Sequence, residues 1–359
     1  MKVLFIVRAT LLTNKGGDTI QIQKTAEYLN KAGIQVSIKF SNEKIDYSTF
    51  DLIHFFNIIR PADILLHIHK SEKPYVISPI FVEYEEYDRT ARAGFSGFLF
   101  RLLPAGTIEY AKVMARSLLN GERIISKEYV FYGHTSSIKK ILKHARLLLP
   151  NSDNEYRRLY RSYQIEKEFE IIPNAVDDMF LLQNTAAIVK DPTMIISVAR
   201  IEGLKNQLNL IRALNNTSYS LLLIGNISIN QNRYYEQCRK EAAGNIHFVP
   251  YVMQQKLVEY YQKAKVHVLA SWFETTGLSS LEAAAMGCNV VITDKGDTRE
   301  YFGDDAFYCN PSSPESIYLA IESAAKKEQN NLSSKIAERY TWKHTADKTA
   351  AAYHRVLIS

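Results

Sequence analysis

The chain has 359 residues, of which 46% are hydrophobic and 23% charged, and its net charge is +6. These values exclude a disordered or fibrous chain and leave room for two or three domains with sizeable cores. The apolar run within Met1–Thr10 is too short for a signal peptide, and no apolar stretch reaches membrane-spanning length. The three scattered cysteines show no metal-ligand spacing, so we expect a reduced, cytoplasmic compartment.

Strands and helices alternate through the first half of the chain. Apolar runs predict strands, and a helix over 19–32 ends at Gly33, which suits the position just after a helix. The strands are expected at 3–7, 35–40, 52–56, 75–80 and 146–149. A long helical and basic region is expected between the last two of these strands.

A second α/β series begins after the polar stretch 183–192. Its strands are expected at 194–198, 220–224, 246–248, 266–269, 289–293 and 306–309, with helices at 206–214, 233–243, 254–264 and 278–286. This pattern predicts two doubly wound, Rossmann-like α/β domains facing each other across a cleft. We place them at 1–185 and 186–342, with the final helix, 343–359, packing back on the first domain.

Positive charge concentrates between residues 89 and 146, where eleven Lys and Arg face three acidic residues. Bulky apolar residues are interleaved with these charges, which favours contact with an anionic membrane surface. Nucleic acid would also attract a basic patch, but no nucleic-acid module accompanies it, so no nucleic-acid partner is expected. A solvated basic face is the equally open alternative.

Two glutamates, Glu274 and Glu282, stand in the loop and helix that follow the expected strand 266–269. Open α/β sheets bind ligands at the edge formed by the carboxyl ends of their strands. Thr276, Gly277 and Leu278 open the helix, and the free amides of a helix start suit a phosphate. Carboxylates accept hydrogen bonds from hydroxyls, so the loop predicts a nucleotide sugar as ligand. By itself the spacing also fits a solvated helix start.

Two cations are expected at the same sheet edge. Arg200 and Lys205 lie in the loop after strand 194–198, where they can stabilise the charge that develops on a departing nucleoside diphosphate. In the first half, Gly16 and Gly17 open the first helix, so the backbone there can approach a phosphate or sugar oxygen. Taken alone, the cations also fit a helix-capping turn and the glycines a tight turn.

Together these motifs resemble the retaining group 1 glycosyltransferases of family four, which have the GT-B fold. The resemblance runs from the Gly16-Gly17 pair to the final helix, and it rests on Pro150-Asn-Ser152, Ile172–Asp177, Arg200-x4-Lys205 and Glu274-x7-Glu282. The stretches 273–282 and 296–302 are most similar to bacterial enzymes of capsule, O-antigen and related surface polysaccharide biosynthesis.

The resemblance implies a role for each matching residue. Arg200 and Lys205 would bind the donor diphosphate and Glu274 would touch the transferred sugar, which makes these three the catalytic set. Glu282 would bind the ribose diol, and the amides of residues 276–278 would contact the phosphate or the sugar.

The resemblance also places Tyr251 and Val252 in the stretch that lines the nucleobase. Many relatives carry a histidine or aspartate after the fourth strand of the first domain, and this chain has no histidine there. It has Glu83, Glu86 and Asp88, which we expect to face the acceptor because carboxylates suit sugar recognition. A solvated loop is the alternative. No D-x-D run occurs and the family is metal-independent, so neither a metal site nor a cofactor is expected.

The expected activity is retaining transfer of a sugar from a nucleoside-diphosphate sugar, with UDP as the expected nucleotide, to a glycan or lipid-linked glycan. The first domain would take the acceptor and the second the donor. A sugar-nucleotide epimerase of the same fold and a non-catalytic nucleotide-binding subunit at the membrane are the alternatives. His54, at the end of strand 52–56, is expected to be a satisfied near-core histidine rather than a base.

Overall fold

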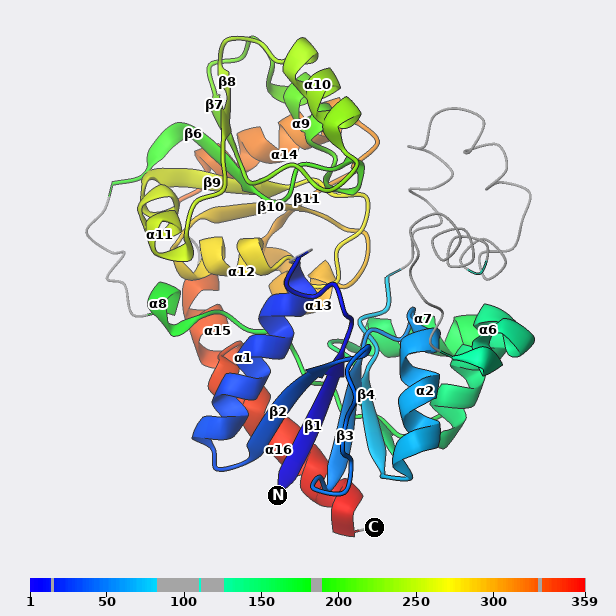
Figure 1. Cartoon of the computed structure of the whole chain (residues 1–359). Helices are drawn as coiled ribbons and strands as arrows, with labels where there is room; N and C mark the ends of the chain where they lie inside the picture. Colours follow the sequence, from blue (N-terminus) through cyan, green and yellow to red (C-terminus); the bar gives the residue numbers. More distant parts are fainter. Residues whose placement is uncertain (14–15, 83–109, 111–125, 182–188, 329–330, 359) are drawn as a thin grey trace. The chain divides into compact units, whose positions relative to one another are not determined.

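The computed structural model describes residues 1–13, 16–82, 110, 126–181, 189–328 and 331–358 (Figure 1). The chain forms two compact units. The first contains Met1–Pro173 together with Trp342–Ser359, and the second contains Asn174–Thr341. Each unit is a Rossmann-like domain built on one parallel sheet, as the sequence predicts.

The first unit has a five-stranded sheet in the order β2-β1-β3-β4-β5. Its strands are β1 (Lys2–Val7), β2 (Gln35–Phe40), β3 (Leu52–Phe56), β4 (Tyr75–Ser78) and β5 (Leu147–Leu148). All neighbouring strands pair in parallel. The central strands β1, β3 and β4 are almost continuously apolar because helices cover both of their faces.

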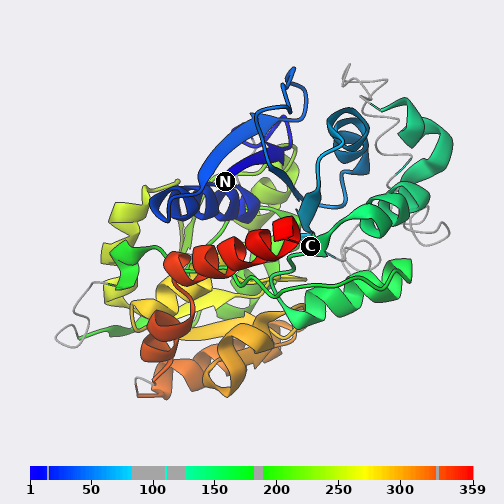
Figure 2. The ribbon, with the colours of Figure 1, turned by 90° about the horizontal axis from the view of Figure 1, so that it is seen from below.

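Helices from both ends of the chain cover this sheet. They are α1 (Gly17–Lys31), α2 (Pro61–Ser71), α6 (Lys127–His144), α7 (Asp153–Tyr163) and α16 (Trp342–Ile358). Figure 2 shows α16 lying beside α1, and both contribute side chains to one apolar cluster with β1. The final helix therefore packs on the first unit, as the sequence predicts.

His54 of β3 joins the sheet to α16. Its Nδ1 lies 2.6 Å from the Tyr353 hydroxyl and its Nε2 lies 2.9 Å from Oγ of Ser78. Burial lowers the pKa of His54 to about 3, so the ring is neutral at physiological pH. This confirms the prediction of a satisfied core histidine.

The second unit has a six-stranded parallel sheet in the order β11-β10-β9-β6-β7-β8. Its strands are β6 (Asp191–Val198), β7 (Ser220–Ile224), β8 (Ile246–Val249), β9 (Ala264–Leu269), β10 (Asn289–Thr293) and β11 (Phe307–Cys309). The order places β6 and β9 side by side at the centre of the sheet. Their carboxyl ends carry the two loops in which the sequence places the charged residues.

Short helices connect these strands. They are α8 (Asp178–Leu181), the 3₁₀ turn η1 (Gly203–Lys205), α9 (Gln207–Leu214), α10 (Asn232–Glu241), α11 (Gln254–Lys263), α12 (Leu278–Ala285), α13 (Thr298–Phe302), η2 (Gly303–Asp305), α14 (Pro314–Lys326) and α15 (Leu332–Arg339). Two apolar clusters, one on each face of the sheet, form the core.

The segment 174–181 belongs to the second unit by its contacts, although the sequence-based division places it in the first domain. Val176 and Phe180 are fully buried in an apolar cluster of the second unit, and Val176 bridges to Thr341. These contacts fix where the chain leaves the first unit. The sequence-based boundary itself, between residues 185 and 186, lies outside the described residues and stays a prediction.

Candidate active site

The predicted donor residues of the second unit lie in the loops that follow β6, β8 and β9 and in helix α12, which follows the last of these loops. Because all strands of this sheet are parallel, these loops share one edge of the sheet. The structure joins two of these residues directly, Lys205 and Glu274. The other donor residues are distributed around that pair.

The ion pair between Lys205 and Glu274 connects the loop after β6 to the loop after β9. The Nζ atom of Lys205 lies 2.6 Å from Oε1 of Glu274, and the side chains are 19% and 7% exposed. A backbone hydrogen bond from Trp272 to the carbonyl of Leu204, 2.9 Å long, holds the same two loops together. A cation and a carboxylate are thus held together at the carboxyl ends of the two central strands, β6 and β9.

Asn206 fixes the turn that carries Lys205. It adopts a left-handed conformation (φ 58°), which asparagine tolerates better than most residues. Its Nδ2 donates to the carbonyl oxygens of Ala270, at 2.9 Å, and Pro311, at 2.7 Å. One buried amide therefore anchors the loop after β6 to the ends of two other strands.

The backbone of Glu274 is held against a glycine. Glu274 donates its N–H to the Lys295 carbonyl, and its own carbonyl accepts from the Asp297 N–H at 2.9 Å. Gly296 lies between these partners at φ +98°, and a Cβ atom there would meet the Glu274 carbonyl oxygen at 2.0 Å. Only glycine fits this close approach, which holds the backbone of Glu274 in place.

Helix α12 begins beside Glu274, as the sequence predicts. Gly277 is the residue before the helix and has a left-handed conformation (φ 73°), so the chain turns sharply into Leu278. Thr276 is buried, and its Oγ1 accepts a hydrogen bond of 3.0 Å from Nδ2 of Asn174. The start of the helix is thereby fixed, and its first-turn amides suit an anionic oxygen.

Glu282 lies one turn into α12 and is 8% exposed. Its carboxylate accepts hydrogen bonds from the Tyr261 hydroxyl, at 3.1 Å, and from Nε2 of Gln254, at 3.3 Å. Burial raises the pKa of Glu282 to about 7, and the nearby Asp177 carboxylate acts in the same direction. The two hydrogen bonds oppose this shift. The carboxyl group therefore changes charge near neutral pH.

Arg200 follows β6 and points its guanidinium toward a carboxylate of its own loop. Nη2 of Arg200 lies 2.9 Å from Oε1 of Glu202. Gly225, at the end of β7, permits the close approach of the two loops, because a Cβ atom there would meet the carbonyl oxygen of Ala199 at 2.1 Å. Both predicted cations of this edge are thus paired with carboxylates of the same unit.

Tyr251 and Val252 follow β8 and differ in exposure. Tyr251 is 63% exposed, and its backbone N–H lies 3.4 Å from Oδ1 of Asn226. Val252 packs against the apolar core. The exposed ring and the backbone of this loop can contact a ligand, whereas the Val252 side chain serves the core.

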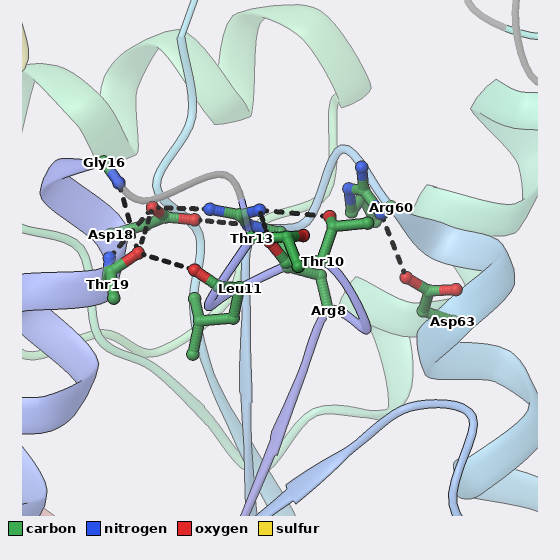
Figure 3. Close-up of polar contacts among 9 residues, drawn as sticks. All are labelled: Arg8, Thr10, Leu11, Thr13, Gly16, Asp18, Thr19, Arg60 and Asp63. Atoms are coloured by element: carbon green, nitrogen blue, oxygen red, sulfur yellow. Dashed lines mark hydrogen bonds and ion pairs between the residues drawn. The ribbon is translucent and has the colours of Figure 1, made fainter. Parts of the chain in front are cut away.

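Gly16 and Gly17 lie in the first unit, at the start of α1 (Figure 3). The Gly16 N–H lies 3.2 Å from Oγ1 of Thr19, so this amide is already used within the chain. Asp18 forms a bidentate ion pair with Arg8, at 2.7 and 3.0 Å. A ligand contact by the two glycines stays a prediction.

The expected acceptor residues Glu83, Glu86 and Asp88 lie outside the described residues, as does most of the basic segment 89–146. Among the residues that are described, no group of three or more His, Cys, Asp or Glu side chains could hold a metal ion. Within the same part of the chain, no helix is both long and apolar enough to cross a membrane. The independence from metal stays a prediction.

Three residues that shape this edge are missing from the sequence-based set: Glu202, Asn206 and Asn174. Each stands inside or next to a motif that the sequence analysis quotes. Apart from Arg200, two residues from Glu202, the partners of their side chains lie 26 to 105 residues away along the chain, so sequence spacing carries no signal for those contacts. The tolerance of asparagine for left-handed turns is the one local signal that could have indicated Asn206.

Comparison with known proteins finds one family model that matches most of the second unit. Residues 180–341 match the model of the family described as "Glycosyl transferases group 1". An uncharacterized glycosyltransferase of Methanocaldococcus jannaschii is 26% identical over 185 residues, which make up 48% of this chain and 47% of that protein. The match thus spans about half the length of this curated relative.

Solved structures resemble the whole chain. The sucrose-phosphate synthase of Thermosynechococcus elongatus matches with a TM-score of 0.75 at 16% identity, over 100% of this chain and 99% of its own. HepE of Anabaena, solved in complex with UDP and glucose, matches with a TM-score of 0.68 at 13% identity, over 99% of both chains. At such low identity the likeness concerns the fold alone, and it confirms the predicted GT-B class.

Proposed function

Because residues 180–341 match the glycosyl transferases group 1 family and the chain has the GT-B fold, we propose that this protein is a retaining glycosyltransferase. It moves a sugar from a nucleoside-diphosphate sugar to a glycan or lipid-linked glycan and uses no metal. The observation that carries this proposal is the contact between Lys205 and Glu274 at the carboxyl edge of the sheet. That contact brings a diphosphate-binding cation and a hydroxyl-binding carboxylate to the start of α12.

The roles of the charged residues follow from the charge of the departing group. As the bond to the sugar breaks, negative charge grows on the diphosphate, and Arg200 and Lys205 stabilise it. The first-turn amides of α12 hold a phosphate oxygen, and Glu274 accepts hydrogen bonds from the sugar hydroxyls. Glu282, deeper in α12, accepts from the ribose diol, for which its carboxylate form is needed.

UDP is the proposed nucleotide. The support is that HepE, a protein of similar fold, is solved with UDP, with UDP and glucose, and with UDP-glucose. In this chain the exposed Tyr251 ring and its backbone stand where the loop after β8 can contact a planar base. The assignment is tested together with the donor site.

The donor site is tested by thermal shift with UDP, GDP, dTDP and their sugars. A ligand at 100 times its Kd stabilises the folded protein by about 2.7 kcal/mol. We expect UDP and a UDP-sugar to raise Tm, and Arg200→Ala and Lys205→Ala to abolish the increase. Arg212→Ala is the matched control, because Arg212 pairs with Glu241 on the exposed faces of α9 and α10. If no nucleotide raises Tm, or if UDP raises the Tm of Arg200→Ala as much as that of wild type, the proposed donor site is refuted.

Retention of the anomeric configuration is proposed through front-face attack. The acceptor hydroxyl approaches on the side of the leaving diphosphate, and a phosphate oxygen takes its proton. No protein base is then needed, which agrees with the absence of a histidine from residues 78–88, directly after the fourth strand. The anomeric configuration of the product, determined by NMR, tests this mechanism. An inverted linkage would refute retention and leave the fold assignment intact.

Two alternative functions give different results in the same assays. An epimerase converts a nucleotide sugar without any acceptor, so incubation with the donor alone, followed by separation of the sugar products, identifies it. A non-catalytic subunit binds UDP but transfers nothing to any acceptor. The pairing of Lys205 with Glu274 favours the transferase over a degenerate donor site.

We also propose that the protein works in bacterial surface polysaccharide biosynthesis, bound peripherally to the cytoplasmic face of the membrane. Supporting residues lie on α6, where Val130, Phe131 and Tyr132 are exposed in succession, Phe131 by 88%. Lys139 and Lys143 are exposed on the part of α6 that follows a kink at Gly133. Aromatic rings and lysines together suit an anionic lipid surface.

Membrane binding is tested by sedimentation with vesicles of anionic lipid. We expect the protein to sediment at low salt and to dissociate as salt rises, because screening weakens the attraction between lysines and lipid. Phe131→Ala should weaken sedimentation, whereas Phe307→Ala, in the second unit, should not. Equal binding to neutral and anionic vesicles would contradict the proposal.

A further inference from the structure

The carboxylate of Glu202 joins Arg200 to a residue on the next loop of the sheet. Oε1 of Glu202 lies 2.9 Å from Nη2 of Arg200, and Oε2 accepts a hydrogen bond of 2.7 Å from Oγ of Ser228. The Glu202 side chain is 14% exposed, whereas that of Arg200 is 37% exposed. The arginine is therefore the more exposed partner of this pair, and the glutamate is the more buried one.

The backbone next to Glu202 is held by two hydrogen bonds of Ile201. Ile201 donates its N–H to the Asn226 carbonyl at 2.9 Å, and Ser228 donates its N–H to the Ile201 carbonyl at 3.1 Å. These bonds form a bridge between the loop after β6 and the loop after β7. Ser228 is thus placed by the backbone to receive the Glu202 carboxylate.

We propose that Glu202 is a positioning residue that holds the Arg200 guanidinium at the donor edge through this relay to Ser228. The inference rests on the proposed function and adds to it the group that orients Arg200. A guanidinium carries five donors in one plane, so fixing one donor restricts the direction of the others. An arginine oriented before the donor arrives loses less side-chain freedom when the diphosphate charge develops.

A contribution to stability alone does not explain the arrangement. Ion pairs with a partner exposed to this degree contribute little to folding. The pair between Arg212 and Glu241 has comparable distances, 2.7 and 3.0 Å, but lies on the exposed faces of α9 and α10. It provides the matched control, because it has the same chemistry without a place at the donor edge.

The test compares Glu202→Ala, Glu202→Gln and Ser228→Ala with Glu241→Ala, in the full chain with a UDP-sugar and its acceptor. We expect Glu202→Ala to lower kcat about tenfold, because misplacing a group that acts on the transition state lowers turnover. Donor KM and Tm should change little. Glu202→Gln keeps one oxygen that can accept from Arg200, and its amide nitrogen can donate to Oγ of Ser228, so it should retain most of the activity. Ser228→Ala should fall between these two, and Glu241→Ala should match wild type.

Two results would overturn the inference. The first is a Glu202→Ala enzyme with kcat within about twofold of wild type. The second is an equal loss in Glu202→Ala and Glu202→Gln that follows a loss of Tm, because that pattern indicates a structural role only. If wild type neither binds nor uses any nucleotide sugar, the proposed function fails and this inference falls with it. If the wild-type enzyme transfers the sugar and Glu202→Ala is equally active, only the positioning role of Glu202 is refuted and the proposed function stands.

Discussion

Replacing Glu282 with glutamine should make the protein more stable at neutral pH and a weaker binder of its donor. Burial raises the pKa of this carboxyl from 4.5 to about 7 in the folded chain. One pKa unit corresponds to about 1.36 kcal/mol, so ionising Glu282 costs the folded state about 3 kcal/mol. Glutamine keeps the shape of the side chain and can still hydrogen-bond to Tyr261 and Gln254.

The sign of the pH dependence follows from which state ionises first. Between pH 4.5 and 7 the unfolded chain loses the Glu282 proton while the folded chain keeps it, so wild-type stability falls as pH rises through this window. The Glu282→Gln variant lacks this loss. Its advantage over wild type should therefore grow by about 2–3 kcal/mol from pH 5 to pH 8, or roughly 5–10 °C in Tm for a unit of this size.

Thermal unfolding of both proteins at several pH values measures this difference, and calorimetry with UDP measures the accompanying loss of affinity. That loss should be roughly 10- to 150-fold, because a hydrogen bond to a charged group contributes about 1.5–3 kcal/mol. Glu241→Gln is the control of opposite sign, because the hydrogen bond from Arg212 lowers the pKa of Glu241. If the Tm difference between Glu282→Gln and wild type is the same at pH 5 and pH 8, the carboxyl does not titrate in this window and the reasoning is wrong.

Three further substitutions have expected outcomes. Lys205→Met should lower kcat by about 10²–10³-fold, because it removes a cation that acts on the leaving diphosphate. Steady-state kinetics measure this loss. A decrease in kcat of less than about threefold would contradict the proposed role of Lys205. Gly296→Ala should cost more than about 2 kcal/mol in urea unfolding and also reduce kcat, because its Cβ would meet the Glu274 carbonyl. An unchanged urea midpoint would show that the backbone can yield there. Tyr353→Phe should cost about 1–3 kcal/mol, since it leaves a buried nitrogen of His54 without its partner, while kcat per folded molecule stays at the wild-type value. A loss of kcat without a loss of stability would instead give His54 a catalytic part.

The central strands were predictable because they are short apolar runs that are buried on both faces. Asn289–Thr293 and Leu52–Phe56 match their predicted bounds, and every residue in them is buried. The expected strand 75–80 ends earlier, at Ser78, because Pro79 follows and Ile80 takes a positive φ of 47°. Such an ending depends on backbone conformation, which an apolar pattern does not reveal.

Two helices begin with a capping serine that is readable in the sequence. The helix Asp153–Tyr163 begins after Ser152, whose side chain accepts from the Glu155 N–H, and Pro314–Lys326 begins after Ser313 in the same way. Serine before an acidic or proline-containing first turn is a recognisable start. These helices were therefore predictable from local sequence.

For the candidate site, too, the features that depend on local sequence and strand order were predictable, and those that depend on distant partners were not. The loops that carry Arg200, Lys205, Glu274 and Glu282 follow from strand order, since neighbouring parallel strands bring their ends together. The pairing of Lys205 with Glu274 and the near-neutral pKa of Glu282 were not predictable. Both depend on burial and on partners far apart in the chain, such as Tyr261.

The packing of α16 on the first unit has a consequence for synthesis of the chain on the ribosome. The second unit, Asn174–Thr341, is contiguous, so it can fold as soon as it has left the exit tunnel. The first unit is translated earlier but lacks Tyr353 and its neighbours until Trp342–Ile358 has been made. The amino-terminal half therefore has to wait for the carboxyl end of the chain, with His54 and the apolar surface under α16 open to chaperones in the meantime.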